Sequence, residues 1–363
     1  MFFFPFFFNL LQNLGNLKVI ELRFCVHLTE VPDLSRSKKI EDIVLFGCER
    51  LVRIPSYFKD LDKLRWLNLG KCSSLEFLPE LPVLCCLEAS GCTSLKTVSS
   101  SRNSLTQAWD KYELFRGRFN FVDCPKLNEN ARTNIMADTQ LRIMRVATGP
   151  LKTQQRKEEE LVMEMTSSIP MCYRTTRSTD SARTLVSTAC TGYEIPNWFC
   201  HQNEGSSITI KLPRNWYCTD FLGFALSVVL PPQISYMELM LGCSCNFKTN
   251  SGESHETIYP THYPLNAKGE VVAYSPFGQV FVWYSAFALG EGANLNRSNS
   301  FYKLVTGACF EFNAVDACRR REFKVKKCGI SLLYAKDVET IKWGGNTGWS
   351  SQKKKVRNEK LRI

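Results

Sequence analysis

The chain has 363 residues, of which 44% are hydrophobic and 22% are charged, a composition that excludes a disordered protein and leaves room for two or three domains. Its net charge of +11 is concentrated at one end, because residues 352–363 hold six Lys or Arg and one Glu. The rest of the chain carries an ordinary charge. The overall basicity therefore does not predict a nucleic-acid partner.

Residues 1–16 form an apolar leader that begins MFFFPFFF. The leader lacks the positively charged start and the small-residue cleavage site of a signal peptide, and its apolar run is too short to span a bilayer. A truncated gene start explains this segment at least as well as a genuine membrane segment does. We therefore expect a soluble protein without a membrane partner.

Residues 17–98 contain four copies of one apolar spacing, in which Leu-x-x-Leu-x-Leu is followed by Cys and then by further apolar residues. The cysteines step by 23, 24 and 20 residues, which lies inside the period of about 20–29 for leucine-rich repeats. A degenerate fifth copy follows over residues 119–127. The pattern predicts an α/β leucine-rich repeat solenoid over residues 17–130, with its thiols stacked as small buried groups. The repeat cysteines are Cys25, Cys48, Cys72, Cys92 and Cys124.

The residues between and beside the inward Leu positions are expected to point to the open concave face of such a solenoid. Phe46 and Trp66 are the predicted anchors for a protein ligand, because aromatic residues dominate interface energetics. The alternative is that a short array uses this face only to contact the rest of its own receptor. The predicted face consists of Glu21, Arg23, Asp42, Phe46, Trp66, Asn68 and Glu88.

The sequence changes character between the repeats and the C-terminal half. Residues 128–142 are predicted to form a helix that caps the array, and residues 131–191 as a whole read as helix and flexible linker. Beyond residue 192 the apolar pattern alternates in short runs separated by turn signals, which predicts an all-β antiparallel sandwich over residues 192–335. The expected strands cover residues 206–212, 221–230, 237–247, 280–287, 308–313 and 323–334.

Several segments also resemble one protein family. LNLGKCSSLEFLP at residues 67–79 resembles the repeats of plant nucleotide-binding leucine-rich repeat receptors of the Toll/interleukin-1 receptor class, and residues 119–127 resemble the end of their array. EIPNWF at residues 194–199 and KCGISLLY at residues 327–334 resemble the first and last parts of their C-terminal jelly-roll and Ig-like domain. The matching structural residues there are Pro196, Trp198, Phe199, Gly205, Ser206, Trp216, Gly223, Phe224, Cys328, Gly329 and Tyr334.

The resemblance implies a non-enzymatic recognition module of a plant immune receptor. Such a module would bind a pathogen effector protein through the concave repeat face and the sandwich loops, and would contact other domains or chains of the receptor. The alternative is a truncated receptor or decoy fragment with no ligand of its own. Neither hypothesis requires a cofactor or a small-molecule substrate.

The sequence contains no motif that predicts an enzyme. None of its four histidines lies in a nucleophile or zinc motif, and no phosphate-binding loop occurs. Cys243-x-Cys245 lacks a second Cys/His pair at zinc-finger spacing. Trp198, Trp216 and Phe224 could form a carbohydrate-binding set, but core packing is the preferred interpretation.

Cellular location is predicted from the cysteines and from the tail. The repeat cysteines indicate a reduced, cytoplasmic protein rather than a secreted disulfide scaffold. The basic tail within residues 336–363 has the composition of a nuclear-import signal, although a solvated terminus is the simpler interpretation. The residues of this candidate signal are Lys353, Lys354, Lys355 and Arg357.

Overall fold

The computed structural model describes residues 15–108, 117–149, 184–232, 239–259, 261–263, 275–285, 301–316 and 320–343. The chain divides into two compact units, of which the first comprises Met1–Arg142 with Thr188–Thr191 and the second comprises Ile143–Ser187 with Gly192–Ile363. Residues 1–14 of the leader, the charged segment of the linker and the candidate import signal Lys353, Lys354, Lys355 and Arg357 lie outside the described residues.

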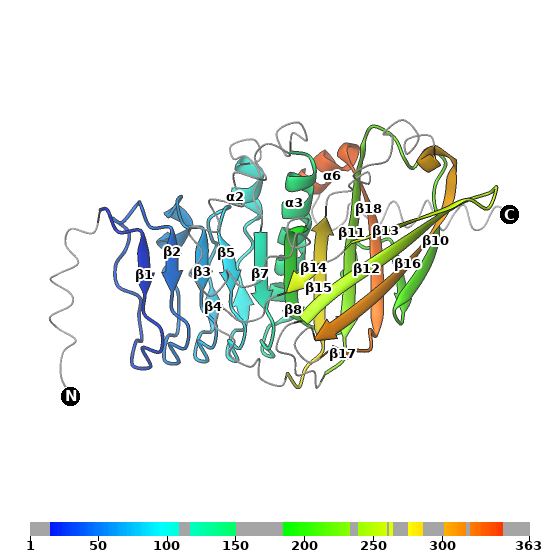
Figure 1. Cartoon of the computed structure of the whole chain (residues 1–363). Coiled ribbons are helices and arrows are strands. Elements are labelled where there is room, and N and C mark those ends of the chain that lie inside the picture. Colours follow the sequence, from blue (N-terminus) through cyan, green and yellow to red (C-terminus); the bar gives the residue numbers. More distant parts are fainter. Residues whose placement is uncertain are drawn as a thin grey trace. The chain divides into compact units, whose positions relative to one another are not determined.

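The first unit is built on a row of short parallel strands (Figure 1). Each strand pairs in register with the next, so that Ile43 lies beside Leu67 and Leu67 beside Leu87. The Leu-x-Leu spacing places both leucines of a strand on one side, and Leu67 and Leu69 are fully buried as predicted. The strands are β1 (Val19–Glu21), β2 (Asp42–Val44), β3 (Trp66–Asn68), β5 (Cys86–Glu88) and β7 (Gly117–Phe121).

The other side of each turn carries smaller elements. β4 (Phe77–Leu78) and β6 (Thr97–Val98) form a two-stranded parallel sheet, and η2 (Ser56–Asp60) is a 3-10 helix that buries Phe58. α2 (Arg102–Gln107) follows the fourth turn. The turns thus enclose one continuous apolar core, which includes Leu34, Leu51 and Leu75.

The repeat cysteines form the predicted column of free thiols. From Cys48 onward, each thiol of the column donates a hydrogen bond to a carbonyl oxygen of the preceding turn. Burial raises the pKa of Cys48 to about 11 and of Cys72 to about 12, so these two thiols keep their protons at neutral pH. The Sγ–O distances are 3.1 Å from Cys48 to Leu22, 3.2 Å from Cys72 to Leu45, 3.1 Å from Cys92 to Leu69 and 3.2 Å from Cys124 to Ala89.

The residue before each of these cysteines adopts a left-handed backbone conformation, which the spacing of the leucines did not reveal. Its N–H continues the parallel ladder beyond the strand, as in the 2.8 Å bond from Gly47 to the carbonyl of Gly70. Glycine suits this conformation best, and two of the five turns use it. The residues and their φ angles are Phe24 (55°), Gly47 (73°), Lys71 (57°), Gly91 (72°) and Asp123 (58°).

The predicted cap helix is present as α3 (Glu129–Ala147), which extends further than expected and is buried over its C-terminal half. The flexible-linker prediction is wrong at its end, because β8 (Thr184–Thr191) is a strand whose last four residues belong to the first unit. Its Ser and Thr residues suggested a linker, yet β-branched Thr and Val fit a strand well. Their hydroxyls can also be satisfied by hydrogen bonds, as between Thr188 and Thr139 at 2.8 Å.

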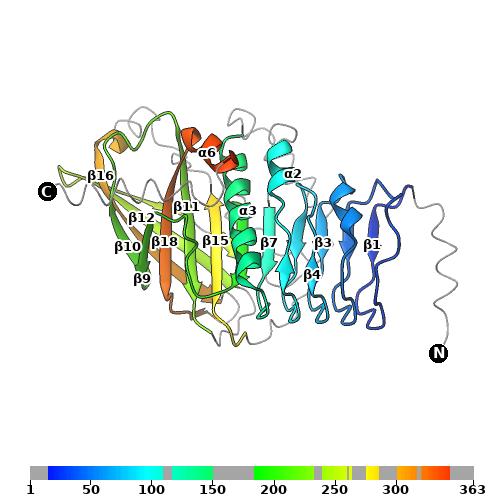
Figure 2. The same ribbon diagram turned by 180° about the vertical axis from the view of Figure 1, so that it is seen from behind.

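The second unit contains two antiparallel sheets (Figures 1 and 2). One has the order β15 (Gln279–Ser285), β11 (Phe221–Leu230), β18 (Lys327–Tyr334) and β9 (His201–Glu204). The other has the order β10 (Ser207–Lys211), β16 (Val305–Asp316), β12 (Leu239–Thr249) and β13 (Ser254–Ile258). β14 (Thr261–Tyr263) pairs with β12, and β17 (Arg321–Glu322) pairs with β16. η6 (Ala335–Asp337) and α6 (Val338–Trp343) follow β18.

The antiparallel strands are largely where the sequence predicted them. β10 and β11 coincide with the expected runs, whereas β18 begins at Lys327, so the strand predicted over residues 323–334 was too long at its start. β9 and β13 were missed because their side chains are mostly exposed and lack an apolar alternation.

Aromatic rings join the two sheets of the second unit. The ring of Phe224 on β11 lies 5.2 Å from that of Phe310 on β16, and Trp283 on β15 lies 6.1 Å from Phe312. Trp216 stacks on Phe247 at 5.6 Å with an interplanar angle of 10°. The inner faces of the two sheets therefore share one aromatic core.

Candidate functional site

The strand row of the first unit brings the predicted face residues into two adjacent columns. Asp42, Trp66 and Cys86 are register partners and form one column. Val44, Asn68, Glu88 and Asn120 form the next column, two residues further along each strand. These side chains lie on the side of each strand opposite to the buried leucines, as the alternation required.

The three polar side chains of the second column each accept a hydrogen bond from the backbone N–H two residues further along the chain. Asn68 Oδ1 accepts the N–H of Gly70 at 3.0 Å, Glu88 Oε1 accepts that of Ser90 at 3.0 Å, and Asn120 Oδ1 accepts that of Val122 at 3.0 Å. Asn120 Nδ2 also donates to both carboxylate oxygens of Glu88, at 3.1 and 3.0 Å. These bonds fix the geometry where the strands end and the left-handed residues follow.

The expectation that every one of these residues faces open solvent is wrong for Asn68, which is 2% exposed. A buried amide must be hydrogen-bonded, and the bond to Gly70 meets this need. Glu88 is half-buried, and burial raises the pKa of its carboxyl group. Asn120 was missed by the prediction, although its place between Phe119 and Phe121 in the degenerate repeat indicates the same column.

At the start of the row, Glu21 is exposed and accepts a hydrogen bond from Arg23 Nε, while Arg23 itself is half-buried. The Arg23 guanidinium is therefore already engaged by Glu21, the last residue of β1. An exposed ion pair of this kind contributes little to stability.

The two predicted anchors are half-buried, and an exposed ring lies beside one of them. Phe46 makes an edge-to-face contact with Phe24 at 5.4 Å, and Lys71 Nζ lies 5.3 Å from the centre of the Phe46 ring. Phe24 is 56% exposed. Its ring covers Gly47, where an added Cβ would approach Phe24 to 2.7 Å. Phe24 was not among the predicted face residues, although it lies two residues after the inward Leu22 in the first turn just as Gly47 lies two residues after Leu45 in the second.

Asp42 gives the face a pH-dependent stability. Burial and the neighbouring Glu41 raise its pKa to about 6, against the opposing effect of Arg65. The Asp42 carboxyl group has a higher pKa in the folded than in the unfolded state. The stability that its protonated form contributes is therefore fully present below about pH 4 and is lost as the pH rises through 6.

We therefore expect Asp42→Asn to stabilise the protein by about 1 kcal/mol at pH 7.5, after allowance for solvent screening of a half-buried group, and to change little at pH 4. Urea unfolding at both pH values measures the difference. Asp62→Asn, at an exposed position, controls for the change in net charge. A stabilisation that is the same at both pH values would contradict the assignment.

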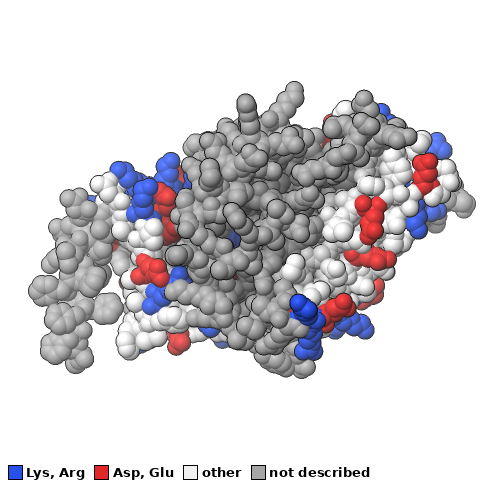
Figure 3. Space-filling model, in the orientation of Figure 1, with Lys and Arg blue, Asp and Glu red and all other residues white. Residues whose placement is uncertain are grey.

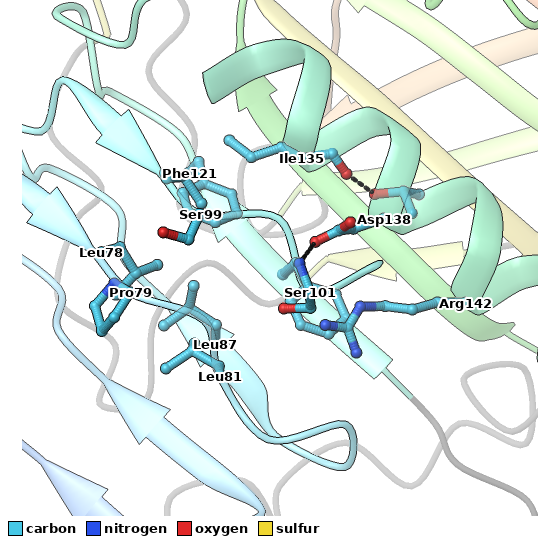
Figure 4. A pocket seen from close by; sticks show the side chains of 13 residues that line it. Leu78, Pro79, Leu81, Leu87, Ser99, Ser101, Phe121, Ile135, Asp138 and Arg142 are labelled. Carbon is cyan, nitrogen blue, oxygen red and sulfur yellow. Dashed lines mark hydrogen bonds between the residues drawn. The ribbon is translucent and has the colours of Figure 1, made fainter. Parts of the chain in front are cut away.

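A small cavity of about 30 Å³ lies beneath α3 in the first unit (Figure 4). Asp138 accepts hydrogen bonds there from the Ser101 N–H at 2.6 Å and from Ser100 Oγ at 2.7 Å. Arg142 Nη1 donates to the carbonyl of Val83 at 3.0 Å, and its guanidinium lies 4.1 Å from the centre of the Phe119 ring. The cavity has room for one or two water molecules, so its polar groups serve to fasten α3 to the fourth turn.

Other features bear on alternative functions. In the described part of the chain, no group of three His, Cys, Asp or Glu residues is arranged to hold a metal ion, and no helix combines the length and apolarity of a membrane span. On the face shown in Figure 3, basic and acidic side chains are interspersed among the described residues, and neither sign forms a continuous patch. The described residues visible on that face form no basic stripe of the kind that tracks nucleic acid.

In the second unit the residues singled out by the resemblance are mainly structural. Trp198, Trp216 and Phe224 are buried, which confirms core packing and contradicts the carbohydrate-binding alternative for them. Trp198 stacks on Phe199 at 4.1 Å, and a Cβ on Gly329 would lie 2.7 Å from the side chain of Ile195. The others lie in turns, strands or the core: Pro196, whose carbonyl accepts the Phe199 N–H, Gly205 (φ 86°), Ser206, Gly223 (φ 125°), buried Cys328 and half-buried Tyr334.

Comparison with known proteins agrees with this arrangement. Residues 190–339 match the family described as the C-JID domain. We refer to residues 190–339 as the C-JID domain after this match. Within the C-JID domain lie all the described strands of the second unit from β9 onward, together with Trp198, Trp216 and Phe224.

Similarity to curated proteins extends beyond the C-JID domain into the repeats. The chain is 28% identical to Disease resistance-like protein DSC1 of Arabidopsis thaliana over 320 residues, which are 85% of this chain and 24% of that protein. It is 27% identical to Disease resistance protein RPS4 of the same plant, over 86% of this chain and 24% of that protein. The chain thus spans about a quarter of the length of these relatives. The predicted resemblance to the C-terminal part of plant Toll/interleukin-1 receptor-type disease resistance proteins is confirmed.

Proposed function

We propose that the chain is a recognition module of a plant intracellular immune receptor, in which a leucine-rich repeat solenoid precedes the C-JID domain. The observation that carries this proposal is the row of in-register parallel strands with a stacked thiol column, in a chain whose relatives are disease resistance proteins. The thiol column explains why the cysteines recur once per turn. It requires reduced thiols, which supports a cytoplasmic or nuclear location that imaging of a fluorescent fusion would test.

The partner we propose is a pathogen effector protein, bound by the strand face and by loops of the C-JID domain together. A specific interface usually buries about 1,600 Å² in total, and five short strands supply only part of one partner's share. The aromatic group of Phe24, Phe46 and Trp66 is the best candidate for the anchor, because it combines exposed or half-buried rings with little conformational freedom.

Binding of the full chain to a panel of secreted pathogen effector proteins tests this proposal. Phe46→Ala combined with Trp66→Ala is expected to weaken any specific complex at least about tenfold, as for anchor residues in other interfaces. The matched control is Phe77→Ala, which removes an exposed ring from β4 in the separate two-stranded sheet.

The outcomes separate the hypotheses. Undiminished binding after the double change would place recognition in the C-JID loops. If no effector binds the folded chain across a broad panel, the truncated-receptor or decoy hypothesis becomes the better one. An equal loss with Phe77→Ala would indicate general damage to the fold and would remove the support for a specific strand-face site.

A further inference from the structure

In the first three turns of the repeat array, the carbonyls of Leu22, Leu45 and Leu69 each accept two hydrogen bonds. The carbonyl of Leu45 accepts the N–H of Cys48 at 3.1 Å and the thiol of Cys72, from the next turn, at 3.2 Å. The carbonyl of Leu69 likewise accepts the N–H of Cys72 at 3.1 Å and the thiol of Cys92 at 3.1 Å. The cysteine thiol of each following turn thus supplies the second hydrogen bond to a carbonyl of the turn before it.

At the last turn this role passes to a residue far away in sequence. Phe121 occupies the place of Leu45 and Leu69, and the hydroxyl of Thr191 donates to its carbonyl at 3.3 Å. The same hydroxyl accepts the N–H of Cys124 at 2.9 Å. A hydroxyl can donate and accept at once, so Thr191 supplies what the thiol of a further turn would supply and also satisfies Cys124.

The neighbours of Thr191 support the same interpretation. Cys190 is buried in the apolar core of the repeats. Thr139 on α3 donates its hydroxyl to the carbonyl of Ile135 at 2.7 Å, so in its 2.8 Å contact with Thr188 it must accept. Residues 188–191 are therefore joined to β7, to the core and to α3 within the first unit.

We propose that residues 188–191 form the closing turn of the repeat array. In this turn the hydroxyl of Thr191 takes the place that a cysteine thiol has in the preceding turns. The family match of the C-JID domain begins at residue 190, so two residues of that match complete the repeats that precede it. Formation of the last repeat turn would then depend on a segment that lies more than 60 residues after Cys124. This inference concerns the fold of the array and does not depend on effector binding.

Hydrogen exchange of single amides in the full chain tests the proposal. Thr191→Val keeps the shape and removes the hydroxyl, and it is expected to speed exchange of the Cys124 amide roughly tenfold or more, since a buried N–H loses its acceptor. Thr191→Ser keeps the hydroxyl and is expected to stay within about threefold of the wild type. Amides of β11 in the second unit are expected to be unaffected. Thr209→Val, on the exposed side of β10, is the matched control.

A third variant keeps the test decisive if Thr191→Val fails to fold. Thr191→Cys introduces the side chain that all the other turns have at this place. It is expected to fold and to protect the amides of residues 117–127 from hydrogen exchange better than Thr191→Val does. Unchanged exchange at Cys124 in Thr191→Val would overturn the proposal. The same holds if Thr191→Ser or Thr191→Cys were as damaging as Thr191→Val.

Discussion

Leu69→Asp is expected to unfold the repeat array while leaving the C-JID domain folded. Leu69 is fully buried between turns, and its carbonyl accepts hydrogen bonds from Cys72 and Cys92. A carboxylate at this place would be buried without a charged partner, and it would also leave a cavity, so we expect a loss of at least about 4 kcal/mol. Because each turn is stabilised by packing against its neighbours, the loss of stability should spread along the array.

The measurement is urea unfolding followed by circular dichroism, with hydrogen exchange to locate the loss. Glu21→Ala on β1 is the control, since the Glu21 side chain is 50% exposed and its pairing with Arg23 lies at the surface. It is expected to cost less than about 0.5 kcal/mol. Equal destabilisation by the two changes would contradict the register of the strands.

The apolar spacing predicted the inward residues because burial in a repeat depends on identical positions in successive turns. Leu67 and Leu69 follow from Leu-x-Leu alone, and the cysteine column follows from one Cys per turn. What the spacing could not show is which groups the thiols bond to. The Cys72 thiol reaches the Leu45 carbonyl only because the preceding strand lies in register beside it.

The predicted face was less accurate, because a position between or beside the inward leucines was taken to mean exposure. Asn68 is polar and buried, and its amide oxygen is used by the N–H of Gly70. Phe24 is apolar and exposed, in a left-handed conformation that Gly47 and Gly91 occupy in other turns. Local backbone geometry decides both cases, and a single sequence does not display it.

The strand at residues 184–191 was missed for a different reason. Its residues TLVSTACT have the composition of a linker when seen in isolation. They become a strand because Thr188 and Thr191 find partners on α3 and β7, which are distant in sequence. A composition-based boundary cannot anticipate such contacts, and it therefore placed the end of the linker at residue 191.

Trp216→Ala is expected to cost the C-JID domain about 3–5 kcal/mol, as for other large aromatic residues removed from a core. Trp216 is 2% exposed, and its indole N–H donates to the carbonyl of Val305 at 3.2 Å. Its ring also lies 5.0 Å from that of Phe221 in an edge-to-face contact, so truncation would remove packing between the sheets as well as a hydrogen bond.

Chemical denaturation followed by hydrogen exchange measures this loss. Ile258→Ala on β13, where the side chain is 61% exposed, is the control and is expected to cost under about 0.5 kcal/mol. The same pair of variants decides whether Trp216 has a ligand role. A surface aromatic that stacks on a sugar could be removed at little cost in stability, whereas a core residue could not. A Trp216→Ala protein as stable as the wild type would therefore return the carbohydrate-binding hypothesis to consideration and would contradict the aromatic core described for the two sheets.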